Sequence, residues 1–331
     1  MNAYRYSTFL LLAFLSCQSL NAEEFRSIFS EGKISGNIRA YYKTREYDFR
    51  PDEAAFSLGG ALRGETAAIG VAKLGVGFYT AQDLGTNSDD PMKVNNRLGS
   101  DLEVLGEAYL NLAKAGHSLT LGRQKIETPF ANSGDAFMIP FTFEALSYKA
   151  TGLENFLFEF DYINAIKNRN SDEFVDVGAW NSARLGIGEI RNTSGTLNLG
   201  VSYGGGPLKA EAWLTRYAEL FDSAYLRGDY AFSDIGGFKP FVGVQYGSQK
   251  DTGDAWLGTV DSTLYGAQLG SGIGKVTLIA GYNSVASEPD AYRNGAFLAP
   301  FTFSTSPLFT NNMLETFENV DAGSASKFTV S

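Results

Sequence analysis

The chain has 331 residues and a formal net charge of −10, and 44% of its residues are apolar. It contains 37 Gly, 25 Phe and 17 Tyr but only 9 Pro, a composition typical of a β-rich protein rather than a helical one. The acidic balance, with no basic stripe that could neutralise phosphates, argues against nucleic acid as a partner.

Residues 1–22 have the features of a secretory signal peptide. Arg5 is their only charged residue, residues 9–15 form a short apolar core, and Ala22 ends a plausible cleavage site. Lipoprotein processing at Cys17 is an alternative, but the residues before it fit that pattern poorly. Cys17 is the only cysteine, so the predicted mature chain, residues 23–331, would have no disulfide.

After the signal, segments of about ten residues alternate with period two, which is the length of a membrane-spanning strand. In residues 156–163, for example, Phe158 and Phe160 share one face, whereas Glu159 and Asp161 share the other. About 14 strands of this kind are predicted. They begin near Ile34, Phe56, Ile69, Val104, Leu119, Phe143, Phe156, Thr196, Leu208, Ser223, Phe238, Ser262, Lys275 and Lys327.

The connections between these strands alternate between short and long. Short turns are predicted near residues 65–68, 114–117, 151–153, 204–207, 233–237 and 270–274. Long polar loops are predicted near residues 45–55, 81–102, 127–142, 164–194, 248–261 and 284–322. This pattern predicts an all-β fold, a transmembrane antiparallel β-barrel with tight periplasmic turns and longer external loops.

A soluble β-sandwich or β-helix would also contain alternating strands. The apolar faces here, however, carry large aromatic residues near the strand ends, such as Tyr42, Phe78 and Tyr230. Aromatic residues at those positions are typical of the interfacial girdles of a membrane barrel, which is the favoured interpretation.

If the apolar face meets lipid, the opposite face lines a lumen. In phase with that face lie the basic residues Arg39, Arg63, Arg227 and Lys239 and acids such as Glu107. Charges in a narrow pore act strongly on a passing solute because they are partly desolvated. They could equally serve only to hydrate the interior and to pair with one another.

The third long loop combines turn residues with apolar residues. Pro129, Asn132, Gly134 and Pro140 favour sharp turns. Phe130, Asp135, Phe137, Met138, Ile139 and Phe141 lie between or beside them. We expect this loop to fold into the pore as its constriction, whereas the alternative is an ordinary external loop.

Arg123 precedes this loop and has the wrong phase for the lumen. It shares the phase of Leu119 and Leu121, which would face lipid or a neighbouring subunit. A β-bulge at Gly122 would turn it inward, and without that bulge it would lie at an interface or at the rim.

Four parts of the chain form a combined pattern: residues 34–42, residues 58–62, Leu121-Gly122-Arg123-Gln124 followed by Thr128-Pro129, and Gly295-Ala296-Phe297 before Pro300 and Ser306-Pro307-Leu308. Together they resemble the OprD-type family of outer-membrane porins. The resemblance implies an 18-stranded barrel in the outer membrane of a Gram-negative bacterium, with a pore narrowed by the third loop. It also implies passive diffusion of small hydrophilic solutes, often amino acids or organic acids, past a ladder of basic side chains. Arg39, Arg63 and Arg123 are the positions that match that ladder.

This chain departs from the family pattern in its length. About 14 strands are visible, and the chain ends in a non-aromatic residue, Ser331. We therefore expect either a truncated chain or a smaller barrel, and a truncated one would leave costly open edges in lipid. A homotrimer and a monomer both fit the resemblance.

A barrel hydrolase and a non-conducting surface adhesin or structural barrel are the alternatives of other classes. The only histidine, His117, precedes Ser118, and adjacent residues on a turn or strand point apart, so they make a poor base and nucleophile. No HExxH motif, clustered metal ligands or phosphate-binding Gly loop occurs. We expect no catalysis, no metal and no cofactor, with small solutes and outer-membrane lipid as the partners.

Overall fold

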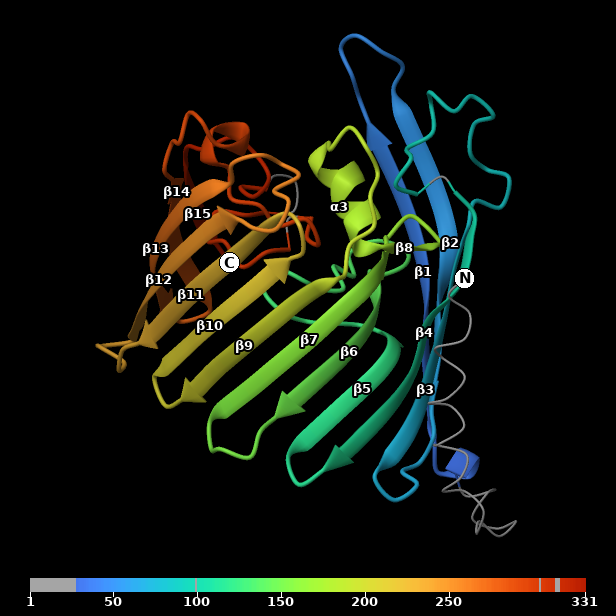
Figure 1. Cartoon of the computed structure of the whole chain (residues 1–331), viewed down its shortest axis with the longest axis horizontal. Helices are drawn as coiled ribbons and strands as arrows, with labels where there is room; N and C mark the ends of the chain where they lie inside the picture. Colours follow the sequence, from blue (N-terminus) through green and yellow to red (C-terminus); the bar gives the residue numbers. More distant parts are fainter. Residues whose placement is uncertain (1–27, 99, 304, 313–315) are drawn as a thin grey trace.

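The computed structural model describes residues 28–331 except 99, 304 and 313–315, so the predicted signal peptide lies outside the described residues. Within them, strands that follow one another in the chain pair side by side in a single antiparallel sheet, and only β8 stands off this path, on β7 (Figure 1). The strands are β1 (Lys33–Arg45), β2 (Glu53–Glu65), β3 (Ala72–Gln82), β4 (Leu102–Lys114), β5 (His117–Gln124), β6 (Thr142–Ala150), β7 (Phe156–Lys167), β8 (Phe174–Asp176), β9 (Thr196–Gly205), β10 (Leu208–Tyr217), β11 (Phe221–Ala231), β12 (Phe238–Asp251), β13 (Asp261–Ile273), β14 (Val276–Val285) and β15 (Ser324–Val330).

The predicted strand pattern is confirmed, because each predicted strand corresponds to one strand on the main path of the sheet. Among the described residues, three elements were not predicted: β8, the helix α3 (Val177–Leu185) and the 3-10 helix η1 (Tyr292–Gly295). The first two lie in the loop expected near residues 164–194. The side chain of Asp176 caps α3 by accepting a hydrogen bond from the backbone N–H of Gly178 at 2.7 Å. Gly186 ends the helix in the left-handed conformation, with φ 74°.

The two ends of the sheet have different connections. Figure 1 shows the tight hairpin turns at one end, for example between β4 and β5, and the longer loops with α3 at the other end. This arrangement confirms the predicted alternation of loop lengths. The 3-10 helix η1 (Tyr292–Gly295) lies in the last long loop.

Apolar and polar side chains are distributed between the two faces of the sheet as in a membrane barrel and not as in a soluble sandwich. Large apolar side chains are exposed on one face, with Leu226 51%, Val244 61% and Leu269 64% accessible. On the same strands, polar side chains such as those of Gln245 and Ser262 point to the buried face. A soluble protein would bury the first set and expose the second, so the apolar face is the one that meets lipid.

The sheet is not closed within the described residues. β1 pairs only with β2, and β15 pairs only with β14, so no ladder joins the first strand to the last in this part of the chain. Figure 1 shows these two ends of the curved sheet standing apart. No helix among the described residues is long and apolar enough to cross a membrane.

Gly60 of β2 has no room for a side chain. Gly60 has φ 151°, and a Cβ atom built on it would lie 2.0 Å from the carbonyl oxygen of Asn37 on β1. We expect Gly60→Ala to prevent assembly of the β1–β2 hairpin. On a gel, the unheated variant would then lack the band of the folded barrel, whose mobility changes on heating. Gly64→Ala is the matched control, because its Cβ would meet only Val76 Cγ2 at 3.7 Å, and normal mobility of both variants would contradict the prediction.

Candidate pore constriction

The loop between β5 and β6, residues 125–141, is called the constriction loop below. Its Phe130 packs edge-to-face on Tyr225 of β11, with ring centroids 4.9 Å apart, whereas its Asp135 contacts Arg39 of β1 at 2.6 Å. Because β1 and β11 lie on opposite parts of the curved sheet, a loop that contacts both of them crosses the space in between (Figure 1). The prediction that the third long loop folds inward is confirmed.

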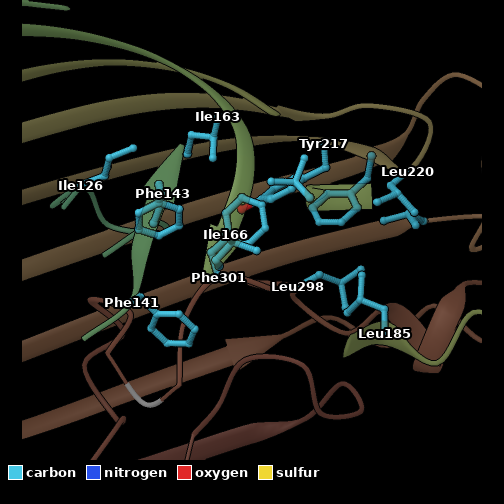
Figure 2. Close-up of a cluster of buried hydrophobic side chains, with 14 of the residues drawn as sticks. Ile126, Phe141, Phe143, Ile163, Ile166, Leu185, Tyr217, Leu220, Leu298 and Phe301 are labelled. Atoms are coloured by element: carbon cyan, nitrogen blue, oxygen red, sulfur yellow. The ribbon is translucent and has the colours of Figure 1, made fainter. Parts of the chain in front are cut away.

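Apolar residues anchor the constriction loop at several places. Phe141 belongs to one buried cluster, shown in Figure 2, together with Phe143 of β6 and Phe301. Met138 and Ile139 belong to a second cluster. Phe130 belongs to a third cluster with Tyr225. The apolar half of the loop therefore fixes its course, because each cluster removes large side chains from water.

Polar contacts add to this anchoring. The buried ammonium of Lys167 donates to the carbonyl oxygen of Pro140 at 2.6 Å. The guanidinium of Arg169 donates to the carbonyl oxygen of Gly134 at 3.2 Å. Pro129 is half-buried at the entrance of the loop. The carbonyls of a chain that leaves the sheet need such donors, since an unpaired buried carbonyl is costly.

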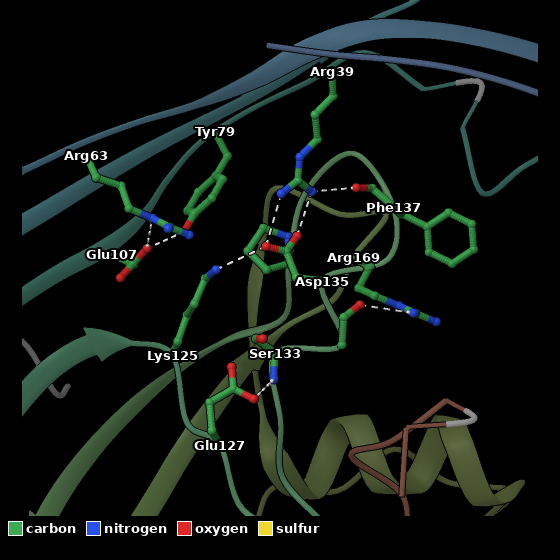
Figure 3. A network of polar contacts seen from close by, with 12 residues as sticks. Arg39, Arg63, Tyr79, Glu107, Lys125, Glu127, Ser133, Asp135, Phe137 and Arg169 are labelled. Carbon is green, nitrogen blue, oxygen red and sulfur yellow. Dashed lines mark hydrogen bonds and ion pairs between the residues drawn. The ribbon is translucent and has the colours of Figure 1, made fainter. Parts of the chain in front are cut away.

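Asp135, Ala136 and Phe137 form the tip of the loop, where Asp135 and Ala136 are exposed to water and Phe137 is half-buried. The carboxylate of Asp135 accepts two hydrogen bonds from the guanidinium of Arg39, at 2.6 and 3.1 Å (Figure 3). It accepts a third from Lys125 Nζ at 3.2 Å. Arg39 also donates to the carbonyl oxygen of Phe137 at 2.7 Å, so one cation holds both ends of the tip.

Arg63 belongs to a second network close to the first (Figure 3). Its Nε donates to Glu107 Oε1 at 2.8 Å and to the hydroxyl of Tyr79 at 3.0 Å. The Tyr79 hydroxyl in turn donates to Glu107. Arg63 is therefore held in one orientation by two partners on β3 and β4.

Cations outnumber acids around the tip. Lys43 Nζ lies 5.5 Å from the ring centroid of Phe137, and the guanidinium carbon of Arg169 lies 4.6 Å from it. The cations in this region are Arg39, Lys43, Arg63, Lys125 and Arg169, and the acids hydrogen-bonded there are Glu107, Glu127 and Asp135. A chain with a net charge of −10 thus has a local positive excess at its constriction loop.

The other predicted basic residues lie elsewhere on the sheet. Arg123 pairs with Glu144 on the neighbouring strand at 2.9 Å. The bulge at Gly122 that would turn Arg123 inward is absent, because the ladders of β5 with β4 and with β6 both continue through Gly122 without a shift of register, and this leaves the alternative of a place at an interface or at the rim. Gly122 instead has φ 115°, which the absence of a side chain allows.

Arg227 and Lys239 are also separate from the tip. Arg227 pairs with Asp229 at 2.6 Å, and its guanidinium carbon lies 5.1 Å from the ring centroid of Phe309. Lys239 is exposed near the start of β12, and it has no ion pair within the residues that the structure describes. The structure therefore groups only Arg39 and Arg63 of the predicted basic set.

A second inward-folded segment was not predicted. The described part of residues 286–323, called the late loop below, lies against the inner wall, where Gln249 donates to the carbonyl oxygen of Leu298 and accepts from its N–H, each at 2.7 Å. Gln245 donates to the carbonyl oxygen of Pro307 at 2.6 Å. Asn132 of the constriction loop donates to Thr305 at 3.1 Å, so the two loops contact each other.

The model of one protein family, described as outer membrane porin, OprD family, matches residues 91–325. The chain belongs to the OprD family. It is therefore an outer-membrane porin of a Gram-negative bacterium, a passive diffusion channel for small hydrophilic solutes.

Solved porin structures share the fold of this porin at low sequence identity. OccK9 (OpdG) of Pseudomonas aeruginosa superposes with a TM-score of 0.71 at 17% identity, over 91% of this chain and 78% of that one. OccAB3 of Acinetobacter baumannii gives 0.72 at 17%, over 88% and 74% of the two chains. OccK2 (OpdF) of P. aeruginosa, in complex with glucuronate, gives 0.73 at 14%, over 91% and 76%. No curated protein sequence matches the chain.

The pKa of Asp135 predicts how the tip of this porin responds to acid. Burial favours the neutral carboxyl, but the hydrogen bond from Arg39 and the charges of Lys125 and Arg39 outweigh it and hold the pKa below the ordinary 3.8. Because the folded value is lowered, the stabilisation by these ion pairs is complete above pH 3.8 and is lost only as the pH falls through the lower folded value.

We therefore expect single-channel noise from tip motion to stay constant from pH 7 down to the ordinary carboxyl value of 3.8 and to rise only below it. Asp135→Asn is the control, since it should remove this transition while other carboxyls still titrate. A transition midpoint above 3.8 that Asp135→Asn abolishes would contradict the assignment.

Proposed function

We propose that this porin passes small hydrophilic solutes that carry a carboxylate, and that the cations around the tip of the constriction loop select them. The observation that carries this proposal is the excess of cations over acids beside a water-accessible tip. Partly desolvated cations attract an anion far more strongly than cations in bulk water do. Arg39 also presents two parallel N–H donors, the arrangement that suits a carboxylate.

The solutes found in related porins support this chemistry. OccK2 was solved with glucuronate and OpdK with vanillate. One is a sugar acid and the other an aromatic acid, and both carry a carboxylate at neutral pH. A site that requires only the carboxylate would accept either.

We assign the basic residues different parts in this path. Arg39, Arg63 and Lys125 would contact the solute at the constriction, because they lie together around the tip. Arg227 and Lys239 would act before or after it, as separate cations along the wall, whereas Arg123, without the bulge that would turn it inward, would lie at the rim or at an interface. Pro129, Phe130, Asp135, Phe137 and Pro140 would shape the constriction itself.

The proposal is tested with the purified porin in planar bilayers. We expect unit current steps and, in a gradient of potassium glucuronate, a reversal potential that shows permeation of glucuronate beyond its small free mobility. Absence of unit steps would favour an adhesin or a purely structural barrel. Unit steps with a strict preference for potassium would refute selection by the cations.

We also propose that this porin acts without catalysis. His117 lies exposed at the turn between β4 and β5, and its Nδ1 is 2.7 Å from the hydroxyl of Tyr148. The adjacent Ser118 follows His117 directly in β5, so the two side chains point to opposite faces of the strand and make a poor base and nucleophile, and the Ser118 hydroxyl instead accepts a hydrogen bond from Asn111 at 2.8 Å. We expect His117→Ala to leave permeability unchanged, and ester hydrolysis by the wild type that this variant loses would contradict the proposal.

The number of subunits is a separate expectation, because a pore within each chain operates in a monomer or in a homotrimer. Cross-linking in intact outer membranes would separate the two. A ladder that ends at three chains would favour the trimer, and a single band would favour the monomer.

A further inference from the structure

Asp135 occupies the position in which the cations of the constriction would hold a carboxylate. Its two oxygens face the two outer nitrogens of Arg39 at 2.6 and 3.1 Å, which is the bidentate arrangement that guanidinium groups form with carboxylates. Lys125 contacts the second oxygen at 3.2 Å. Among the described residues, Arg39 and Lys125 form an ion pair with no other acid.

The Asp135 carboxylate is also within reach of solutes. The side chains of Arg39 and Asp135 are each 26% exposed, and that of Lys125 is 20% exposed. Figure 3 shows the three converging from β1, the tip and the start of the constriction loop. A solute at the tip therefore meets a carboxylate site that already contains a carboxylate.

We propose that Asp135 is an internal carboxylate ligand that competes with solute carboxylates for Arg39 and Lys125, so that a solute passes by exchanging with it. This inference rests on the proposed function, since it concerns the same cations and the same class of solute. It makes Asp135 a specificity-determining residue: solutes without an anionic group do not displace it.

The tip can release Asp135 while the rest of the loop stays folded. Arg39 keeps a hydrogen bond to the carbonyl oxygen of Phe137, and Arg169 keeps one to that of Gly134. Ile139, two residues beyond Phe137, is fully buried. The exchange therefore needs motion of the exposed tip only, and not unfolding of the apolar clusters.

Exchange has a direct consequence for transport. A pore conducts well only if binding is strong enough for entry and weak enough for release. A tethered carboxylate competes at an effective concentration that is millimolar or higher. It raises the apparent dissociation constant of each solute and returns to the cations when the solute leaves.

The test compares block of the chloride current by glucuronate in three porins: wild type, Asp135→Asn and Asp135→Glu. We expect the glucuronate concentration that halves the chloride current to fall about tenfold in Asp135→Asn, because the tethered competitor is removed. In Asp135→Glu this concentration should stay near the wild-type value. Glucose should show no difference between the three. Glu189→Gln is the matched control, since it removes a loop carboxylate whose side chain is 71% exposed.

A second variant separates this effect from a change in folding. Asp135→Cys in a Cys17→Ser background is first measured in the bilayer and then modified with a sulfonate-bearing methanethiosulfonate reagent. The inference predicts strong block before modification and weak block after it, in the same folded porin, with no such reversal by a cationic reagent.

The outcomes distinguish this inference from the proposed function. If the wild type shows unit steps and permeation by glucuronate but Asp135→Asn and Asp135→Cys block as the wild type does, the inference is wrong and the proposed function stands. If the variants change the chloride current and the glucuronate current by the same factor relative to the wild type, Asp135 only stabilises the constriction loop and the inference is wrong. If the wild type neither conducts nor responds to glucuronate, the proposed function itself fails.

Discussion

Replacing residues 132–138 with a short Gly-Ser linker is expected to raise the unit conductance roughly two- to fivefold, because conductance grows as the narrowest part of a pore widens. These residues include the tip and its contact with β1, and they lie between the anchors at Phe130 and Phe141. Their removal therefore takes the crossing segment out of the lumen and leaves part of both anchors in place.

The control for this deletion shortens residues 46–52, where Phe49 is 99% exposed, by the same length. That change should leave the unit conductance unaltered, and both variants should keep a heat-modifiable folded band. Unchanged conductance in the first variant, with the folded band intact, would show that the loop is not the constriction.

The double variant Arg39→Ser, Arg63→Ser is expected to lower the permeability of glucuronate relative to potassium by about tenfold, which corresponds to about 1.4 kcal/mol at the constriction. Both cations lie beside the tip, and Lys125 would then be left with Asp135 as its close partner. The field at the tip changes from positive towards neutral, so the pore loses its attraction for anions.

Reversal potentials in a glucuronate gradient measure this change, and they should be repeated at high salt, where screening reduces the difference. Arg191→Ser is the control, because Arg191 pairs with Glu189 on an exposed loop. If the permeability ratio of the double variant equals that of the wild type, Arg39 and Arg63 have a structural role only.

The strands of this porin could be predicted because apolar residues that face lipid alternate with polar residues that face the lumen along each strand of a membrane barrel. Phe158 and Glu159, for example, already indicate which face meets lipid, and the structure exposes the first and buries the second. The inward course of the constriction loop was also predictable, since a loop with Phe130, Ile139 and Phe141 needs a buried surface.

The rest depends on contacts between segments that are distant in the chain. β8 has three residues, too few to show a period, and it forms because it pairs with the end of β7. The late loop is held by Gln245 and Gln249, whose side chains donate hydrogen bonds to the carbonyl oxygens of Pro307 and Leu298. In the sequence both glutamines have the pattern of ordinary lumen residues, and nothing near them indicates these distant partners.

The candidate site was predicted in part for the same reason. The phase of β1 and β2 indicated that Arg39 and Arg63 face inward, but Lys125 follows the end of β5, where alternation gives no orientation. Its position directly before the turn residues of the loop is the signal that could have been used. The phase of Arg123 left two places open, inward through a bulge or outward at an interface or the rim, and the structure shows no bulge and an ion pair with Glu144.

The central claim is that the apolar face of this sheet meets lipid and the polar face meets water, and cysteine scanning tests it most directly. In a Cys17→Ser background, single cysteines replace Leu226, Val244 and Leu269 on one face and Arg227 and Asp229 on the other, in intact outer membranes. The account predicts that a charged, water-soluble thiol reagent modifies only the second set and that a lipid-soluble reagent modifies the first. Equal modification of both sets by the charged reagent, or modification of the first set alone, would contradict it.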